Sequence, residues 1–152
     1  MTSTASTPAP GLSIGEVAHR TGIPIETLRF YDRSGLLGDL SRNSAGHRVF
    51  DERAMGLLDV VVRLRRTGMP VDDVRGFVDL VRDDRGIPDR IALLTAHRER
   101  VAATISQLQA DLAVVDWKIA AYTAIDRGGE PPEPPPGWPA PGAPLPHPDE
   151  LG

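Results

Sequence analysis

The stretch TLRFYDRSGLL, residues 27–37, combines side chains that bind polyanions with side chains that usually pack in a protein core. Arg29 and Arg33 carry planar guanidinium groups, which donate hydrogen bonds to phosphates and to guanine edges. Phe30 and Tyr31 lie between them, although aromatic residues mostly face inward. Either this helix lies at a core boundary, or its outer face contacts a polyanion.

Elsewhere in the chain, no group of residues has the spacing of a catalytic or metal site. The absence of cysteine excludes disulfides, thiolate metal sites and thiol redox chemistry. None of the four histidines pairs with a second ligand at a metal-binding spacing: His19, His47, His97 and His147. The sequence also lacks a glycine-rich phosphate loop and a nucleophile beside a base. We expect no metal, no cofactor and no enzymatic activity.

The overall charge and hydropathy indicate a globular protein. The net charge of −4 argues against nucleic-acid binding through total charge, but an average can conceal a local basic patch. The basic residues are sixteen arginines and one lysine, a bias that suits phosphate recognition and that a GC-rich genome would also produce. No apolar run approaches the roughly 18 residues of a membrane span, and no signal peptide is recognisable. A cytoplasmic location is expected.

Two short helices with a tight turn between them are predicted near the N-terminus. Ser13 and Glu16 form a capping box, S-x-x-E, that opens a helix over residues 14–20. Thr21-Gly22 ends this helix. A second helix begins near Pro24 or Ile25 and ends at Ser34-Gly35. This pattern is typical of a helix-turn-helix.

A hairpin and two further helices follow. Residues 40–42 and 48–50 are predicted to pair around the turn-forming stretch 43–46, and this hairpin has too few apolar residues for a core of its own. We therefore expect it to lie against the helices as a wing. Apolar periodicity predicts helices over about 52–67, capped by Asp51, and over about 71–81.

The most regular feature is a predicted helix over residues 88–125, about 57 Å long at 1.5 Å per residue. Apolar residues recur along it at alternating spacings of three and four, which is the signature of a coiled coil. Packing onto the chain's own domain can use only about the first two turns, so a second copy is expected to cover the stripe. The dimerisation residues are Leu94, Val101, Ile105, Leu108, Leu112, Val115, Ile119 and Tyr122.

The remaining residues form two tails. Residues 1–11 are small and polar, and residues 127–152 contain ten of the fifteen prolines. Both segments are predicted to be disordered. The domain organisation is therefore a tail over 1–11, a mainly helical winged helix-turn-helix domain with a second helical pair over 12–86, a dimerisation helix over 87–126, and a proline-rich tail over 127–152.

The stretches LSIGEVAHRTGIPIETLRFYDRSGLL and RNSAGHRVFDERAMGLLDVVVRLRRTGMPVDDV, followed by the heptad helix, resemble the MerR family of bacterial transcription regulators. The resemblance covers residues 12 to about 125. It implies an antiparallel coiled coil between two subunits and a near-palindromic promoter element as the ligand. It also implies that the dimer bends and untwists the promoter spacer, which realigns the promoter for RNA polymerase, so that much of the recognition is deformation energy.

The resemblance assigns DNA-binding roles unevenly. Arg29 and Tyr31 occupy the arginine and second aromatic positions of the family's T-L-R-Y-Y stretch, which begins at Thr27, while Phe30 replaces a tyrosine. Arg48 matches the arginine of G-Y-R in the wing. The other candidate phosphate contacts are Arg42, His47, which replaces a tyrosine, and Arg20 and Arg33, which are equally explicable as solvated surface charges.

The resemblance does not define an effector. The metal-sensing and thiol-stress branches use cysteines, which this chain lacks. A small organic effector near Phe77, Trp117 or Tyr122 is one interpretation, and ordinary packing of these aromatic residues is the other. Two alternatives to a DNA-distorting regulator also stay open: a plain repressor or architectural protein, and a coiled-coil module that binds protein through its winged domain.

Overall fold

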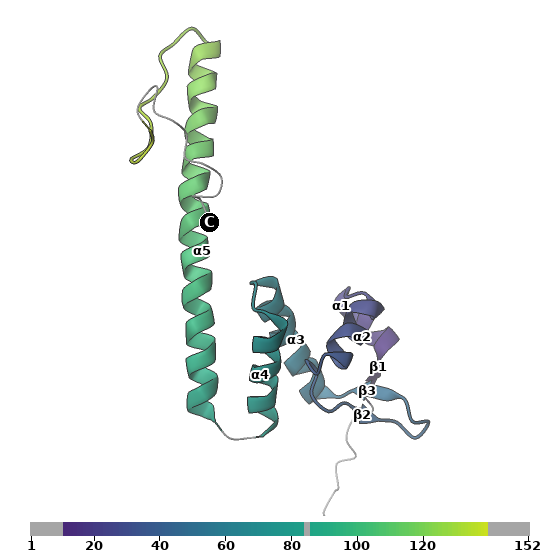
Figure 1. Ribbon diagram of the computed structural model, residues 1–152. Helices are drawn as coiled ribbons and strands as arrows, with labels where there is room; N and C mark the ends of the chain where they lie inside the picture. Colours follow the sequence, from purple (N-terminus) through teal and green to yellow (C-terminus); the bar gives the residue numbers. More distant parts are fainter. Residues whose placement is uncertain (1–10, 84–85, 140–152) are drawn as a thin grey trace, which may run out of the picture. The chain divides into compact units, whose positions relative to one another are not determined.

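The computed structural model describes residues 11–83 and 86–139, which form five helices and one small sheet (Figure 1). The chain divides into two compact units, with the division between Val101 and Ala102. Of the two predicted tails, residues 1–10 and 140–152 lie outside the described residues. The mainly helical fold class predicted from the sequence is confirmed.

The predicted capping box begins helix α1, Ile14–Thr21. The Ser13 backbone N–H donates to Glu16 Oε2 at 2.7 Å, and the Glu16 N–H donates to Ser13 Oγ at 3.2 Å. The helix ends at Gly22, whose φ of 72° lies in the left-handed region that favours glycine. Helix α2, Ile25–Arg33, follows after three residues. These two helices have the predicted helix-turn-helix arrangement.

The sheet contains one strand more than the predicted hairpin. Strands β2, Ser41–Arg42, and β3, Arg48–Phe50, pair antiparallel as expected, and β1, Leu12–Ser13, pairs with the other edge of β3. The strand order is β1-β3-β2. A two-residue strand directly before a helix has no alternating pattern, so the sequence alone did not indicate β1. Through β1, the segment directly before α1 is joined to the wing.

Helices α3, Glu52–Arg66, and α4, Val71–Arg82, complete the first unit. The Asp51 carboxylate caps α3 by accepting from the Ala54 N–H at 2.8 Å. Two buried apolar clusters hold these elements. One joins α1 and α2 to β3 and α3: Val17, Leu28, Leu37, Phe50, Ala54 and Leu58. The other joins α3 to α4: Leu36, Val61, Leu64, Met69, Val74, Phe77 and Val78.

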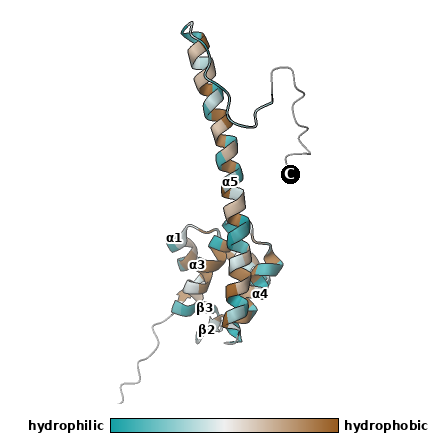
Figure 2. Ribbon diagram, turned by 90° about the vertical axis from the view of Figure 1, so that its left-hand side faces the viewer, coloured by the Kyte–Doolittle hydropathy of each residue, from teal (hydrophilic) through white to brown (hydrophobic). Residues whose placement is uncertain are grey.

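Helix α5, Ile87–Asp126, is a single helix of 40 residues in which hydrophobic and hydrophilic residues recur along the whole length (Figure 2). Its first turns are attached to the preceding helices. The Arg90 guanidinium donates to the Leu80 carbonyl at the end of α4, and His97 Nε2 lies 2.7 Å from Thr67 Oγ1. Among the described residues, no helix is long and apolar enough to cross a membrane.

Candidate nucleic-acid interface

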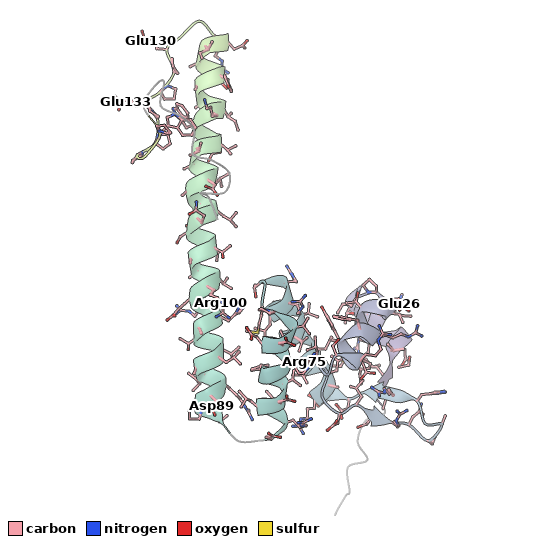
Figure 3. All side chains as sticks on the ribbon, in the orientation of Figure 1. Glu26, Arg75, Asp89, Arg100, Glu130 and Glu133 are labelled. Atoms are coloured by element: carbon pink, nitrogen blue, oxygen red, sulfur yellow. The ribbon has the colours of Figure 1, made fainter. Side chains whose placement is uncertain are left out.

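The outer face of α2 presents a basic and an aromatic side chain. Leu28 is fully buried and anchors the helix, whereas Arg29 is exposed and forms an ion pair with Glu26 at 2.8 Å (Figure 3). Phe30 is 41% exposed, unusually open for a phenylalanine. Thr27 is half-buried. This face therefore offers a guanidinium and an apolar ring side by side.

Tyr31 lies on a different side of α2 from Arg29, and its part in DNA binding stays a prediction. The Tyr31 side chain is half-buried and packs against both apolar clusters. The reason is helical geometry, because two residues correspond to about 200° around an α-helix. Tyr31 instead lies on the same side as Leu28, three residues earlier. Its ring thus helps to hold α2 to the core.

The wing is organised by the side chains of its own turn. Asn43 Oδ1 accepts from the backbone N–H groups of Ala45 at 3.0 Å and His47 at 2.9 Å. The Arg42 guanidinium donates to the Gly46 carbonyl at 2.7 Å, and Gly46 has a φ of 80°. Bonding within the turn fixes the backbone of the wing, while the side chains of Arg42 and His47 remain exposed.

An ion pair between Arg48 of β3 and Asp32 of α2 connects the wing with the helix. A cleft of about 470 Å³ lies between these elements. Its charged and polar lining comes from both sides: Ser13, Arg29, Asp32, Arg42, Asn43, His47 and Arg48. Because the arginines outnumber the single aspartate, the cleft is a basic concavity on a protein of net negative charge.

The remaining candidates lie at the margins. Arg33 is exposed and lines a neighbouring hollow together with Asp32, Asp39, Arg42 and Arg48, among others. Arg20 is exposed in the last turn of α1 and lines neither of these hollows. The structure thus brings Arg29, Arg42, His47 and Arg48 together around one cleft, extends it through Arg33, and leaves Arg20 apart.

Two residues that position this surface were not among the sequence candidates. Asp32 holds Arg48, as described above. Arg75 of α4 donates from Nε to the Ser34 carbonyl at 2.8 Å and pairs with Asp72 at 2.7 Å, so that it caps the end of α2 (Figure 3). Asp32 and Arg75 act on residues 16 and 41 positions away, and such pairings leave no local pattern in a sequence.

The apolar stripe of α5 is largely uncovered within the single chain. Ile105, Leu108, Leu112, Val115, Ile119 and Tyr122 are between 49% and 65% exposed. Val101 is half-buried. Leu94 is half-buried and packs against the α3–α4 cluster of its own chain. Leu94 therefore has contacts within its own chain, and its contribution to dimerisation stays a prediction.

Among residues 11–83 and 86–139, no three histidine, cysteine, aspartate or glutamate side chains come together as metal ligands.

The helix-turn-helix, the wing packed beside it and the basic cleft between them define a winged helix-turn-helix protein. The chain belongs to the MerR family of transcriptional regulators. The family model described as MerR HTH family regulatory protein matches residues 12–80, and the model described as MerR, DNA binding matches residues 56–124.

Relatives and solved structures agree with this membership. An uncharacterised HTH-type transcriptional regulator of Haemophilus influenzae is 32% identical over 109 residues, which cover 70% of this chain and 80% of the relative. The crystal structure of HiNmlR, a MerR family regulator lacking the sensor domain, bound to promoter DNA, has a TM-score of 0.70 and 30% identity over 78% of this chain and 96% of that one. A MerR family regulator from Bacillus thuringiensis has a TM-score of 0.68 and 32% identity over 72% and 97%.

Proposed function

We propose that this protein binds a near-palindromic promoter element as a homodimer and regulates transcription by bending and untwisting the promoter spacer. The observation that carries the proposal is the basic cleft between α2 and the wing, which is lined by Arg29, Arg42 and Arg48. Arginines from two elements suit the phosphates that border a groove. RNA polymerase is then an indirect partner, which meets the protein at the promoter.

The exposed stripe of α5 supports the homodimer. A row of apolar side chains that are about half exposed is costly in water, and a second α5 with the same spacing would cover it. An antiparallel pairing would place the two winged domains at opposite ends of the coiled coil, one for each half-site. The promoter-bound structure of the related HiNmlR supports DNA as the ligand of this family member as well.

Footprinting on the DNA upstream of the protein's own gene tests the proposal. We expect protection with two-fold symmetry and enhanced cleavage at the centre, where a bent and untwisted spacer is exposed. Symmetric protection without distortion would instead favour a plain repressor. Absence of protection at low salt would favour the protein-interaction module and overturn the proposal.

Arginine variants test the binding face. Arg48→Ala should weaken binding to many DNA sequences by about tenfold through loss of a phosphate contact, with a shallower salt dependence. Arg29→Ala should also alter site preference, because α2 faces the groove. The matched control is Arg82→Ala on α4, which removes an arginine of similar exposure, 53% against 55%, from an ion pair of the same i, i+3 spacing. Equal affinities in all three variants, measured by fluorescence anisotropy, would contradict this assignment.

A further inference from the structure

The segment over residues 130–139, which the sequence analysis assigns to a disordered tail, has defined contacts with the second half of α5. In Figure 3 Glu130 and Glu133 mark its path beside the helix. Trp117 Nε1 on α5 donates to the Pro132 carbonyl at 2.9 Å. The rings of Trp117 and Trp138 lie with centroids 5.0 Å apart and planes inclined by 52°. Two tryptophans thus form a V-shaped aromatic pair between the helix and the returning segment.

The ammonium group of Lys118 lies close to both rings of this aromatic pair. Its Nζ lies 4.8 Å from the ring centroid of Trp117, 5.3 Å from that of Trp138 and 5.7 Å from that of Tyr122. All three distances are within the range of about 6 Å for cation–π attraction. Lys118 is the single lysine of the chain, and it forms no ion pair among the residues that the structure describes. Its charge is met by ring faces, not by a carboxylate.

The aromatic pair lies on a different side of α5 from the exposed stripe. In the heptad that places Ile119 and Tyr122 in the dimer seam, Trp117 falls on the outermost position. Ala121, four residues later on the same side of the helix as Trp117, is only 6% exposed. A ligand between the two tryptophans would therefore lie outside the dimer seam and would border it only at the ring of Tyr122.

We propose that Trp117, Tyr122 and Trp138 form a binding site for a small organic ammonium ion, such as a quaternary amine of choline size, which Lys118 fills with its own ammonium in this structure. Ring faces attract a weakly hydrated organic cation, whereas a metal ion would require oxygen or nitrogen ligands. The hydrogen bond to Pro132 fixes the Trp117 ring, so the site is preorganised. Residues 128–139 contain two glutamates and no basic residue, which favours a cation further.

The two tryptophans of the chain are both in this site, so tryptophan fluorescence, excited selectively over that of the tyrosines, reports on the site alone in the full-length protein. Choline chloride is the probe. Sodium chloride at the same concentration controls for ionic strength, and 3,3-dimethylbutan-1-ol, in which carbon replaces the charged nitrogen, controls for shape. We expect a saturable change with choline and none with the neutral alcohol. Identical curves for choline and the alcohol would overturn the proposal.

Variants of Lys118, whose ammonium group competes with choline for the site, provide a second test. In Lys118→Ala the half-saturating choline concentration should fall by about tenfold or more, and Trp138→Ala should abolish saturation. Arg127→Ala, which removes a nearby exposed positive charge, is the matched control and should bind choline like the parent protein. If the emission of Lys118→Ala alone shifts to the red, because residues 130–139 have detached, Lys118→Met keeps the methylene packing and should show the same gain. Binding no tighter than that of the parent in both Lys118 variants would overturn the proposal. The choline titration contains no DNA, so its failure and the failure of the proposed DNA binding are separate outcomes.

Discussion

Asp32 acts on the proposed DNA-binding surface through another residue. Its carboxylate is 17% exposed and pairs with the half-exposed Arg48, so the wing arginine has a defined position before any ligand arrives. An anionic group beside phosphates also opposes non-specific binding. We infer that Asp32 lowers the overall affinity for DNA and, in return, holds Arg48 of the wing in a defined orientation.

The variant Asp32→Asn should therefore reduce the preference for specific over non-specific DNA. Arg48 loses its ionic partner while a negative charge leaves the surface, so non-specific affinity should rise and specific affinity should change little. A partly exposed ion pair contributes at most about 1 kcal/mol. We therefore expect the ratio of specific to non-specific affinity to fall by up to about fivefold. Competition binding against calf-thymus DNA measures it. An unchanged ratio would show that Arg48 needs no fixed position.

The neighbouring aromatic residues Phe30 and Tyr31 of α2 have different environments. The Tyr31 ring packs inward, and Phe30 remains outside next to Arg29 with a centroid distance of 6.0 Å between the two rings. An exposed phenylalanine lacks a hydroxyl for a phosphate but can contact a thymine methyl. The residue without a hydroxyl is thus the one that the fold presents.

At the scale of elements, the capping box orients α1, against which α2 packs. The Ser13 backbone N–H, with the Ser13 hydroxyl, lowers the pKa of Glu16 from its usual value of 4.5. A carboxyl whose pKa is lower in the folded state stabilises the fold fully above the usual value. That contribution is lost as the pH falls through the lowered folded pKa.

Glu16→Gln should therefore destabilise the protein at pH 7, and the difference from the parent should disappear in acid, below the folded pKa of Glu16. Urea unfolding followed by circular dichroism at a series of pH values measures it. Glu99→Gln, a change of the same kind at an exposed position on α5, is the control and should show little effect. A Glu16→Gln difference that is constant with pH would mean that the capping carboxylate does not titrate with folding.

At the scale of the whole molecule, most of the large hydrophobic residues that are exposed among the described residues lie on α5. The early part of the helix is used within the chain, since Leu93 and Leu94 pack against the α3–α4 cluster. The stripe from Ile105 onward has no such support. The continuous exposed part of the stripe therefore runs from Ile105 to Tyr122, and we expect it to form most of the dimer seam.

Replacement of both Ile105 and Leu112 by aspartate should dissociate the dimer, because two charges would be buried in the seam. Operator affinity should fall by at least about tenfold, since two half-sites would no longer be bound by one linked pair of domains. Sedimentation and anisotropy measure the two effects. Ala110→Asp, exposed on the outer side of the same helix, should leave both unchanged. A double variant that remains dimeric would contradict the coiled coil.

The amino-acid sequence by itself determined the features that depend on neighbouring residues. The capping box at Ser13, the cap at Asp51, the ends of the helices and the heptad stripe are local in the chain, so their patterns are legible without a fold. The class of protein followed from the order of these elements.

Only the tertiary structure decided which of these residues meet. The pairing of β1 with β3, the ion pair between Asp32 and Arg48, the contact of Arg75 with Ser34 and the inward position of Tyr31 all depend on packing between segments distant in sequence. The packing of residues 130–139 against Trp117 also depends on distant segments. Proline-rich composition predicts a disordered tail, and only the contacts with α5 define the position of this segment. Composition and periodicity describe what a segment can do alone, whereas burial against a partner selects among those possibilities.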